Sequence, residues 1–282
     1  MKKPLRFALI GQQAWYSKSP DVFKAVFDAT GLTGSFEVLD VTPRQLGQRI
    51  RQQVLDGLSG FSVTIPYKQA VIEFIDDVTP AVQVLGAANC IGVDGSHLYG
   101  YNTDVAGFSL PLREHRIRIK KKPALILGCG GAALAAVYAL YHDFEVREFS
   151  VVGRDAERLA TFARSLSGSL ERASIATQLV SGSMTPLVER CSLVVNCTPV
   201  GGWNDPDSSL LPPVSRWKGV KIYYDLNYNQ GNKLVAAARS AGKVGIDGSA
   251  MLVGQALQSF DIWTGQSVDH DTIYDRVFGT SH

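Results

Sequence analysis

The pattern of hydrophobic and polar positions switches repeatedly between short apolar runs and apolar residues at helical spacing. The runs are bounded by turn residues and predict strands, and the spaced residues predict helices between them. Strands are expected over residues 5–10, 36–41, 60–65, 124–127, 147–152, 192–197, 220–226 and 244–246, with a hairpin at Asp94–Gly95. Strand and helix alternate along most of the chain, which is typical of an α/β fold.

Helix starts are marked by proline, which fits the first helical turn. These prolines are Pro20, Pro43, Pro66 and Pro80. Ser19 is expected to cap the first helix. Ser17 is not needed for that cap, and the two hydroxyls at a helix N-terminus would suit a carboxylate ligand. Lys68 falls in the first turn of the third helix, a poor position for a cation, and an exposed lysine is the simpler interpretation of this segment alone.

The glycine-rich turn after residues 124–127 predicts a dinucleotide site. Gly128, Gly130 and Ala133 fit the G-x-G-x-x-A pattern between a buried strand and a helix over residues 134–140. Gly128 allows a tight turn, Gly130 lets the backbone approach a pyrophosphate, and Ala133 lets helix and strand pack closely. The free N–H groups at the start of the helix face the phosphates. The alternative is a tight strand-to-helix turn that binds no ligand.

The end of the next strand distinguishes NADP from NAD. An acidic residue there usually binds the ribose 2′-hydroxyl of NAD, whereas an arginine accommodates the 2′-phosphate of NADP. Gly153 stands at the strand end, Arg154 follows, and Arg158 lies one helical turn further on. Asp155 either caps the next helix or touches the ribose. NADP is the favoured cofactor, and NAD stays possible.

Two domains are expected. Residues 105–247 form a Rossmann-type domain around the glycine turn, and residues 1–104 form a smaller α/β domain. The final helices, residues 248–282, have no strand left to cover in the second domain and are expected to return to the first. A cleft between the domains would hold a small-molecule substrate against the nicotinamide.

Composition and charge limit the kinds of binding partner and the cellular compartment that are expected. The 282 residues are 45% hydrophobic with a net charge of +2, which argues against nucleic acid, and no run is long enough to span a membrane. The basic segment 113–122 is interpreted as a solvated loop or fraying helix end. The chain starts directly with a strand pattern, unlike a signal peptide. The four cysteines, Cys90, Cys129, Cys191 and Cys197, form no C-x-x-C pair and are expected to be buried thiols of a cytoplasmic protein, and no metal site is expected.

Ordered motifs along nearly the whole chain resemble the shikimate dehydrogenase family. They are SKSP at 17–20, VTIPYK at 63–68, GAAN at 86–89, YNTD at 101–104, GCGGAA at 128–133, NCTPVG at 196–201, YDLNY at 224–228 and GSAMLVGQA at 248–256. The resemblance implies an N-terminal substrate domain, a Rossmann-type domain and NADP-dependent reduction of 3-dehydroshikimate to shikimate in aromatic amino-acid biosynthesis. It reverses the simpler interpretations of Lys68 as an exposed lysine and of Asp104 as a helix cap.

The resemblance also implies roles for individual residues. Lys68 and Asp104 look like the catalytic pair. The substrate-binding residues it implies are Ser17, Ser19, Ser62, Thr64, Lys68, Asn89, Asp104, Tyr228 and Gln255. The cofactor-binding residues it implies are Gly128, Gly130, Gly131, Ala132, Gly153, Arg154, Asp155, Arg158, Thr198, Gly248 and Met251.

Departures from the family pattern keep alternatives open. Ser62 stands where the family usually has asparagine, and Gly153-Arg154-Asp155 replaces Asn-Arg-Thr. One alternative is a shikimate/quinate dehydrogenase with relaxed substrate or NAD preference. Another is a nucleotide-binding regulatory protein without the chemistry, which the retention of Lys68 and Asp104 argues against. A monomer or a homodimer is expected.

Overall fold

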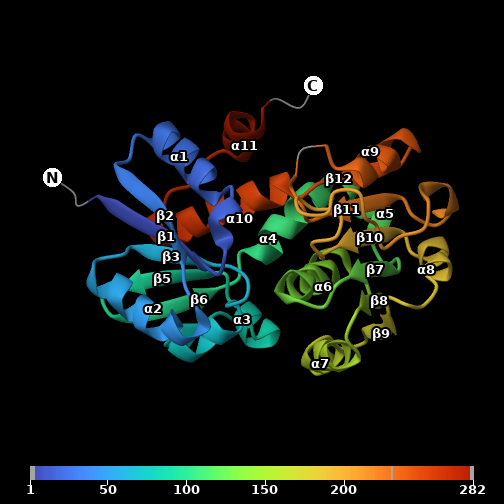
Figure 1. The fold of residues 1–282 in the computed structure, drawn as a ribbon, viewed down its shortest axis with the longest axis horizontal. Coiled ribbons are helices and arrows are strands. Elements are labelled where there is room, and N and C mark those ends of the chain that lie inside the picture. Colours follow the sequence, from blue (N-terminus) through green and yellow to red (C-terminus); the bar gives the residue numbers. More distant parts are fainter. Residues whose placement is uncertain (1–3, 230, 280–282) are drawn as a thin grey trace. The chain divides into compact units, whose positions relative to one another are not determined.

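The computed structural model describes residues 4–229 and 231–279. The chain forms two compact units, Met1–Gly107 with Leu252–His282, and Phe108–Met251. Both crossings between the units fall inside helices, α4 (Asp104–Ser109) and α10 (Ser249–Thr264). The predicted α/β class, with two α/β domains and C-terminal helices that return to the first, is confirmed (Figure 1).

The first unit is built on a mixed six-stranded sheet in the order β2-β1-β3-β5-β6-β4. Its strands are β1 (Leu5–Gly11), β2 (Gly34–Asp40), β3 (Gly60–Val63), β4 (Asp77–Val78), β5 (Cys90–Asp94) and β6 (His97–Tyr101). Strand β1 pairs in parallel with β2 and β3, whereas β5 is antiparallel to both β3 and β6. The antiparallel pairing of β5 and β6 is the predicted hairpin around Asp94–Gly95.

Helices cover both faces of this sheet. They are η1 (Ala14–Tyr16), α1 (Ser19–Thr30), η2 (Pro43–Gln45), α2 (Leu46–Leu55), η3 (Ala70–Phe74), α3 (Pro80–Leu85), α4, α10 and α11 (His270–Phe278). On one face, Phe23 of α1, Phe260 of α10 and Ile273 of α11 share a buried cluster with Phe7 of β1. The C-terminal helices therefore supply part of the core of the N-terminal unit.

The second unit is built on a parallel six-stranded sheet in the order β12-β11-β10-β7-β8-β9. Its strands are β7 (Ala124–Leu127), β8 (Glu148–Gly153), β9 (Ser174–Leu179), β10 (Leu193–Asn196), β11 (Ile222–Asp225) and β12 (Val244–Ile246). Its helices are η4 (Leu110–His115), α5 (Arg116–Ile119), α6 (Gly131–Phe144), α7 (Ala156–Ser167), α8 (Thr185–Arg190), η5 (Val214–Arg216) and α9 (Lys233–Ser240). The order changes direction between β7 and β10, the switch point at which a doubly wound sheet binds its ligand.

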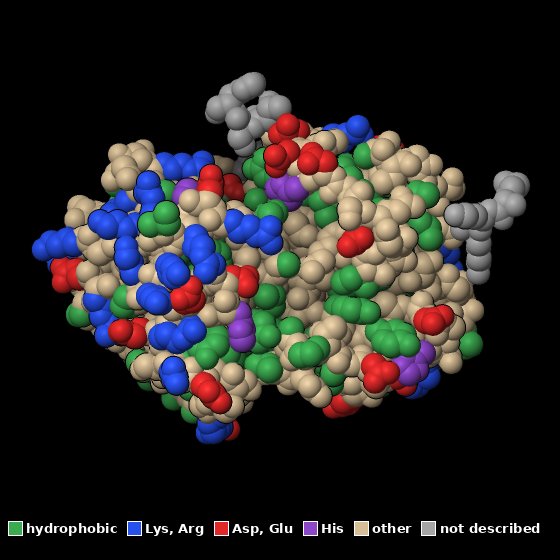
Figure 2. Space-filling model, turned by 180° about the vertical axis from the view of Figure 1, so that it is seen from behind, with side chains coloured by type: hydrophobic (Ala, Val, Ile, Leu, Met, Phe, Trp, Pro, Cys, Tyr) green, Lys and Arg blue, Asp and Glu red, His purple; other side chains and the backbone are tan. Residues whose placement is uncertain are grey.

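The basic segment 113–122 is helical as far as Ile119 and ends in a turn, so of the two expectations the helix end fits and the loop does not. Leu112 and Ile119 are both buried, which anchors η4 and α5 to the unit. Glu145 contacts Arg116 at 3.1 Å and Lys120 at 2.8 Å and so offsets part of the positive charge. The other basic side chains are exposed, and lysine and arginine gather on the face that Figure 2 shows.

Candidate functional site

The two serines of the first motif bond to each other at the start of α1. The Ser17 hydroxyl donates to the Ser19 hydroxyl at 3.1 Å and accepts the Ser19 backbone N–H at 3.2 Å. Ser19 is the first residue of α1, so the expectation that it caps this helix was wrong. Ser17, which was thought unnecessary for the cap, takes up the N–H instead. The paired hydroxyls at a helix N-terminus suit an anionic group.

Lys68 lies in a turn before η3, so its predicted place in the first turn of a helix was wrong. Tyr67 is buried and donates its hydroxyl to the carbonyl of Val41, which fixes the chain in a turn at this point. The helical segment η3 begins two residues after Lys68. Backbone contacts fix the Lys68 turn further, because the Ala88 N–H donates to the Lys68 carbonyl at 2.8 Å. The argument from an unfavourable helix dipole therefore does not apply to Lys68.

Lys68, Asp104 and Asn89 form a connected polar cluster. The Lys68 Nζ lies 2.5 Å from Asp104 Oδ2, and Asn89 Nδ2 donates to Asp104 Oδ1 at 2.9 Å. The Asp104 side chain is 7% exposed and that of Lys68 is 18% exposed. Each carboxylate oxygen of Asp104 thus has its own donor, and the ammonium keeps some access to solvent. An ammonium held this way can exchange a proton with a substrate hydroxyl.

The Asn89 side chain is itself held from two directions. Its Oδ1 accepts the Thr103 N–H at 2.6 Å, and its Nδ2 lies 3.4 Å from Gln255 Oε1 on α10. Ser259, one turn further along α10, bonds to the Thr103 hydroxyl at 3.1 Å. Sequence reasoning missed Thr103 and Ser259 as supports of Asn89.

The other predicted substrate residues lie in different places. Ser62 is buried in β3. Thr64 is the first residue after that strand, and its N–H donates to the Ile10 carbonyl at 2.9 Å. A Cβ atom on Gly11 would lie 2.5 Å from the Thr64 methyl group, so any other residue there would displace the Thr64 side chain. Tyr228 is half-buried and belongs to the second unit.

The glycine turn of the second unit has the shape that a phosphate site needs. Gly128 has a φ of +104° and donates its N–H to the Val152 carbonyl at 2.7 Å. A Cβ on Gly128 would lie 3.2 Å from the Cys197 carbonyl oxygen, whereas one on Gly130 would meet no atom within 4 Å. Gly130 precedes α6, whose first residues are Gly131 and Ala132. The backbone is therefore open on the side of Gly130, where a pyrophosphate would approach.

The end of β8 presents two exposed arginines. Arg154 and Arg158 are both exposed, and Arg158 lies near enough to Cys129 in the glycine turn to oppose the burial that raises the pKa of its thiol. Asp155 caps α7, because its Oδ1 accepts the N–H groups of Glu157 at 2.9 Å and Arg158 at 3.0 Å. The residues beside the glycine turn therefore fit a phosphate-bearing ribose, with positive charge available from two guanidinium groups.

Thr198 sits on a second turn that a buried carboxylate supports. The Thr198 N–H and hydroxyl both donate to Asn196 Oδ1, at 3.1 and 2.7 Å. Asn196 Nδ2 in turn donates to Asp225, and Asn227 Nδ2 donates to Asp225 Oδ1 and to the Thr198 carbonyl. Tyr223 gives Asp225 a further hydroxyl bond at 2.7 Å, and Asp225 is 1% exposed.

Sequence reasoning named Thr198 but missed this network. The available signal was that Asn196 and Asp225 end neighbouring parallel strands, since such ends meet at one sheet edge.

Gly248 and Met251 follow in the same unit. A Cβ on Gly248 would lie 2.1 Å from the Leu226 carbonyl oxygen, so no other residue fits without a backbone shift. The Gly248 N–H donates to the Asn227 carbonyl at 3.0 Å, and Met251 is buried in α10. The 247–251 segment is thereby tied to the strand end that carries Asp225.

The cysteines differ in burial. Cys90 and Cys191 are buried, and burial raises the pKa of their thiols to about 12 and about 11. Cys129 and Cys197 lie in the two turns and are half-buried, so the expectation that all four are buried was wrong. Within residues 4–229 and 231–279, no group of three or more His, Cys, Asp and Glu side chains could hold a metal ion. Over the same ranges, no helix has the length and apolar character that a bilayer crossing needs.

Comparison with known proteins gives consistent similarities. Residues 9–91 match the family described as the shikimate dehydrogenase substrate binding domain. The chain is 36% identical to the NADP-dependent shikimate dehydrogenase of Chlorobaculum tepidum, across 96% of this chain and 94% of that protein.

Solved structures are similar over the same extent. Shikimate 5-dehydrogenase from Thermus thermophilus, in complex with NADP(H) and shikimate, matches with a TM-score of 0.82 and 29% identity, over 97% of this chain and 98% of that one. Quinate dehydrogenase from Corynebacterium glutamicum, in complex with NAD, matches with a TM-score of 0.87 and 27% identity, over 97% and 98%.

Proposed function

Because the chain belongs to the shikimate dehydrogenase family, we propose that it is an NADP-dependent oxidoreductase that interconverts 3-dehydroshikimate and shikimate. The observation that carries the proposal is the Lys68–Asp104–Asn89 cluster, an ion pair in which each Asp104 oxygen has its own donor and the ammonium keeps access to solvent. The class of substrate is a small cyclic acid with several hydroxyl groups.

The first unit handles the substrate in this proposal. The hydroxyls of Ser17 and Ser19 hold the carboxylate at the N-terminus of α1. The ring hydroxyls are bound by four residues, Thr64, Asn89, Asp104 and Gln255. Ser62 stands at the substrate where the family usually has asparagine, and Tyr228, in the second unit, is the tyrosine that closes over the substrate. Lys68 moves the proton of the reacting hydroxyl, and Asp104 keeps the ammonium in position.

The second unit binds the cofactor in this proposal. Bound NADP supplies the hydride chemistry. Gly128, Gly130, Gly131 and Ala132 receive the pyrophosphate, while Arg154 and Arg158 bind the 2′-phosphate beside Gly153 and Asp155. Thr198, Gly248 and Met251 line the part of the site at the second turn.

Initial rates with purified protein test the proposal, with shikimate and quinate each crossed with NADP and NAD. Strong turnover with shikimate and NADP alone is the expected result. Turnover with quinate or NAD would favour a broader shikimate/quinate dehydrogenase. Two observations motivate this alternative, namely Ser62 and the similarity to an NAD-bound quinate dehydrogenase. Cofactor binding without turnover in all four would favour a regulatory protein and refute the enzyme.

The arginine clamp has a test of its own. Arg154→Ala with Arg158→Ala should raise KM for NADP by about tenfold or more, since each lost charge-assisted bond is worth about 1.5–3 kcal/mol. KM for NAD, which has no 2′-phosphate, should change little. Equal changes with both cofactors would show that the arginines do not bind the 2′-phosphate.

We also propose a cytoplasmic protein that acts as a monomer or a homodimer. The free thiols of Cys90 and Cys191 agree with a reducing compartment. Light scattering during size-exclusion chromatography distinguishes monomer from dimer, and cell fractionation tests the compartment.

A further inference from the structure

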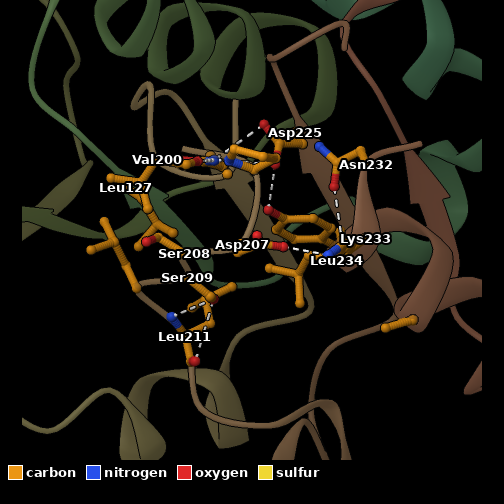
Figure 3. Close-up of a pocket in the computed structure, with 16 residues that line it drawn as sticks. Leu127, Val200, Asp207, Ser208, Ser209, Leu211, Asp225, Asn232, Lys233 and Leu234 are labelled. Atoms are coloured by element: carbon orange, nitrogen blue, oxygen red, sulfur yellow. Dashed lines mark hydrogen bonds and ion pairs between the residues drawn. The ribbon is translucent and has the colours of Figure 1, made fainter. Parts of the chain in front are cut away.

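A cavity of about 240 Å³ opens at the carboxyl edge of the second sheet (Figure 3). Its walls come from the ends of β7, β10 and β11, from residues 200–211 and from the beginning of α9. Among the described residues that line it, none is assigned above to the substrate or the cofactor. The cavity is therefore a separate feature of the unit.

One buried polar group of the cavity wall has a donor without a partner among the described residues. Asn232 is 7% exposed and caps α9 through Oδ1, which accepts the N–H groups of Leu234 at 3.2 Å and Val235 at 3.1 Å. Its Nδ2 has no hydrogen-bond partner among the residues that the structure describes. A buried donor without a partner is costly, so such a group usually serves a bound molecule or water.

Asp225 brings a negative charge to the same cavity. The donors to its carboxylate, Asn196, Tyr223 and Asn227, are neutral and already occupy both oxygens, so they leave the charge uncompensated. Asp225 and Asn232 lie toward the same end of the cavity in Figure 3. A ligand group there meets one free donor beside a negative charge.

The rest of the wall is largely apolar. Leu127, Leu211 and Leu234 line it. Its volume lies between the roughly 150 Å³ of a protein cavity that binds benzene and the roughly 300 Å³ at which ordinary small-molecule sites begin. The space suits a molecule with one small ring.

We propose that this cavity binds a small uncharged hydroxylated molecule, about one ring in size. Its hydroxyl oxygen accepts from Asn232 Nδ2, the one wall donor that lacks a partner among the described residues. A carboxylate would be repelled by Asp225, and an ammonium group offers no acceptor to Asn232. The ring packs against the leucines. Since Asp225 also holds Asn196 and hence the Thr198 turn, the bound molecule contacts the support of that turn.

Binding of 4-fluorophenol to the full chain, followed by ¹⁹F NMR, tests the proposal. Saturable binding is expected, and it should persist with saturating NADP. Asn232→Asp keeps the capping oxygen but replaces the amide donor with a negatively charged carboxylate oxygen, so the affinity should fall by about tenfold or more. Asn204→Asp makes the same chemical change at an exposed residue outside the cavity and should leave binding unchanged.

Several results would overturn the proposal. The first is the absence of saturable binding, and the second is equal affinity in the wild type and Asn232→Asp. The third is complete displacement by NADP, which would make the cavity part of the cofactor site. Fluorobenzene, which lacks the hydroxyl, should bind more weakly than 4-fluorophenol, and equal binding would contradict recognition of a hydroxyl. Circular dichroism of both variants checks that they fold.

Discussion

Replacing Asp225 with asparagine should destabilise the second unit although the change is nearly isosteric. The carboxylate accepts from Tyr223 at 2.7 Å, from the Asn227 N–H at 3.0 Å and from Asn227 Nδ2 at 2.8 Å. Asn196 Nδ2 adds a further bond at 3.1 Å. An amide in either orientation turns an NH₂ group toward some of these donors.

The magnitude follows from these bonds. Hydrogen bonds to a charged group contribute about 1.5–3 kcal/mol and neutral ones about 0.5–1.5 kcal/mol, so each retained bond weakens by about 1 kcal/mol. Tyr223 can reverse its hydroxyl toward the new NH₂, and relief of the buried charge offsets part of the loss. The free energy of unfolding should therefore fall by about 2–4 kcal/mol.

Urea unfolding followed by tryptophan fluorescence measures this change, because Trp217, one of the four tryptophans, is buried in the core of the second unit. Asp207→Asn is the matched control, since Asp207 is exposed and pairs with Lys233 at the surface, where an ion pair contributes about 0–1 kcal/mol. A loss below about 1 kcal/mol for Asp225→Asn would refute the view that its charge holds the turn together.

Three further perturbations have definite expected outcomes. Lys68→Ala should lower kcat by about 100-fold and leave NADP binding unchanged. The control is Lys24→Ala, at an exposed ion pair with Asp28, which should leave kcat intact. A Lys68→Ala variant that keeps more than about a tenth of the rate would exclude Lys68 from proton transfer. Asp155→Ala should cost about 1 kcal/mol in thermal unfolding because the α7 cap is lost, and Asp155→Ser should restore most of it; equal stabilities would contradict the cap. Partial desolvation lowers the pKa of the exposed His142 in the folded protein, so the unfolded chain binds the extra proton first and stability should fall slightly as pH drops below about 6.5. His142→Gln should flatten the pH dependence of urea unfolding in that range, and an unchanged slope would assign it to other groups.

The local pattern of apolar and polar residues was sufficient to predict the fold class and most strands and helices. It carries no information on contacts between residues far apart in the sequence. The glycine turn could be recognised because its strand and helix are contiguous with it. The strand β9 was missed because most of its residues are exposed, so it lacks the apolar run of a buried strand.

The polar cluster of the first unit depends on contacts between distant positions. Lys68 and Asp104 are 36 residues apart, and Asn89 and Gln255 are 166 apart. No periodicity links such positions, and only the family resemblance brought them together before the structure did. Their roles in catalysis and binding stay predictions.

The return of the C-terminal helices has a consequence for synthesis on the ribosome. The second unit is one continuous stretch, Phe108–Met251, whereas the first needs Leu252–His282 to finish its core. Phe260 and Ile273, both fully buried there, emerge only after the whole second unit has been translated. The nascent N-terminal segment therefore waits, with part of its apolar face uncovered, while the later segment already has everything that it needs to fold. Ribosome-bound chains stopped after residue 251 should show a protease-resistant second unit and a sensitive first one.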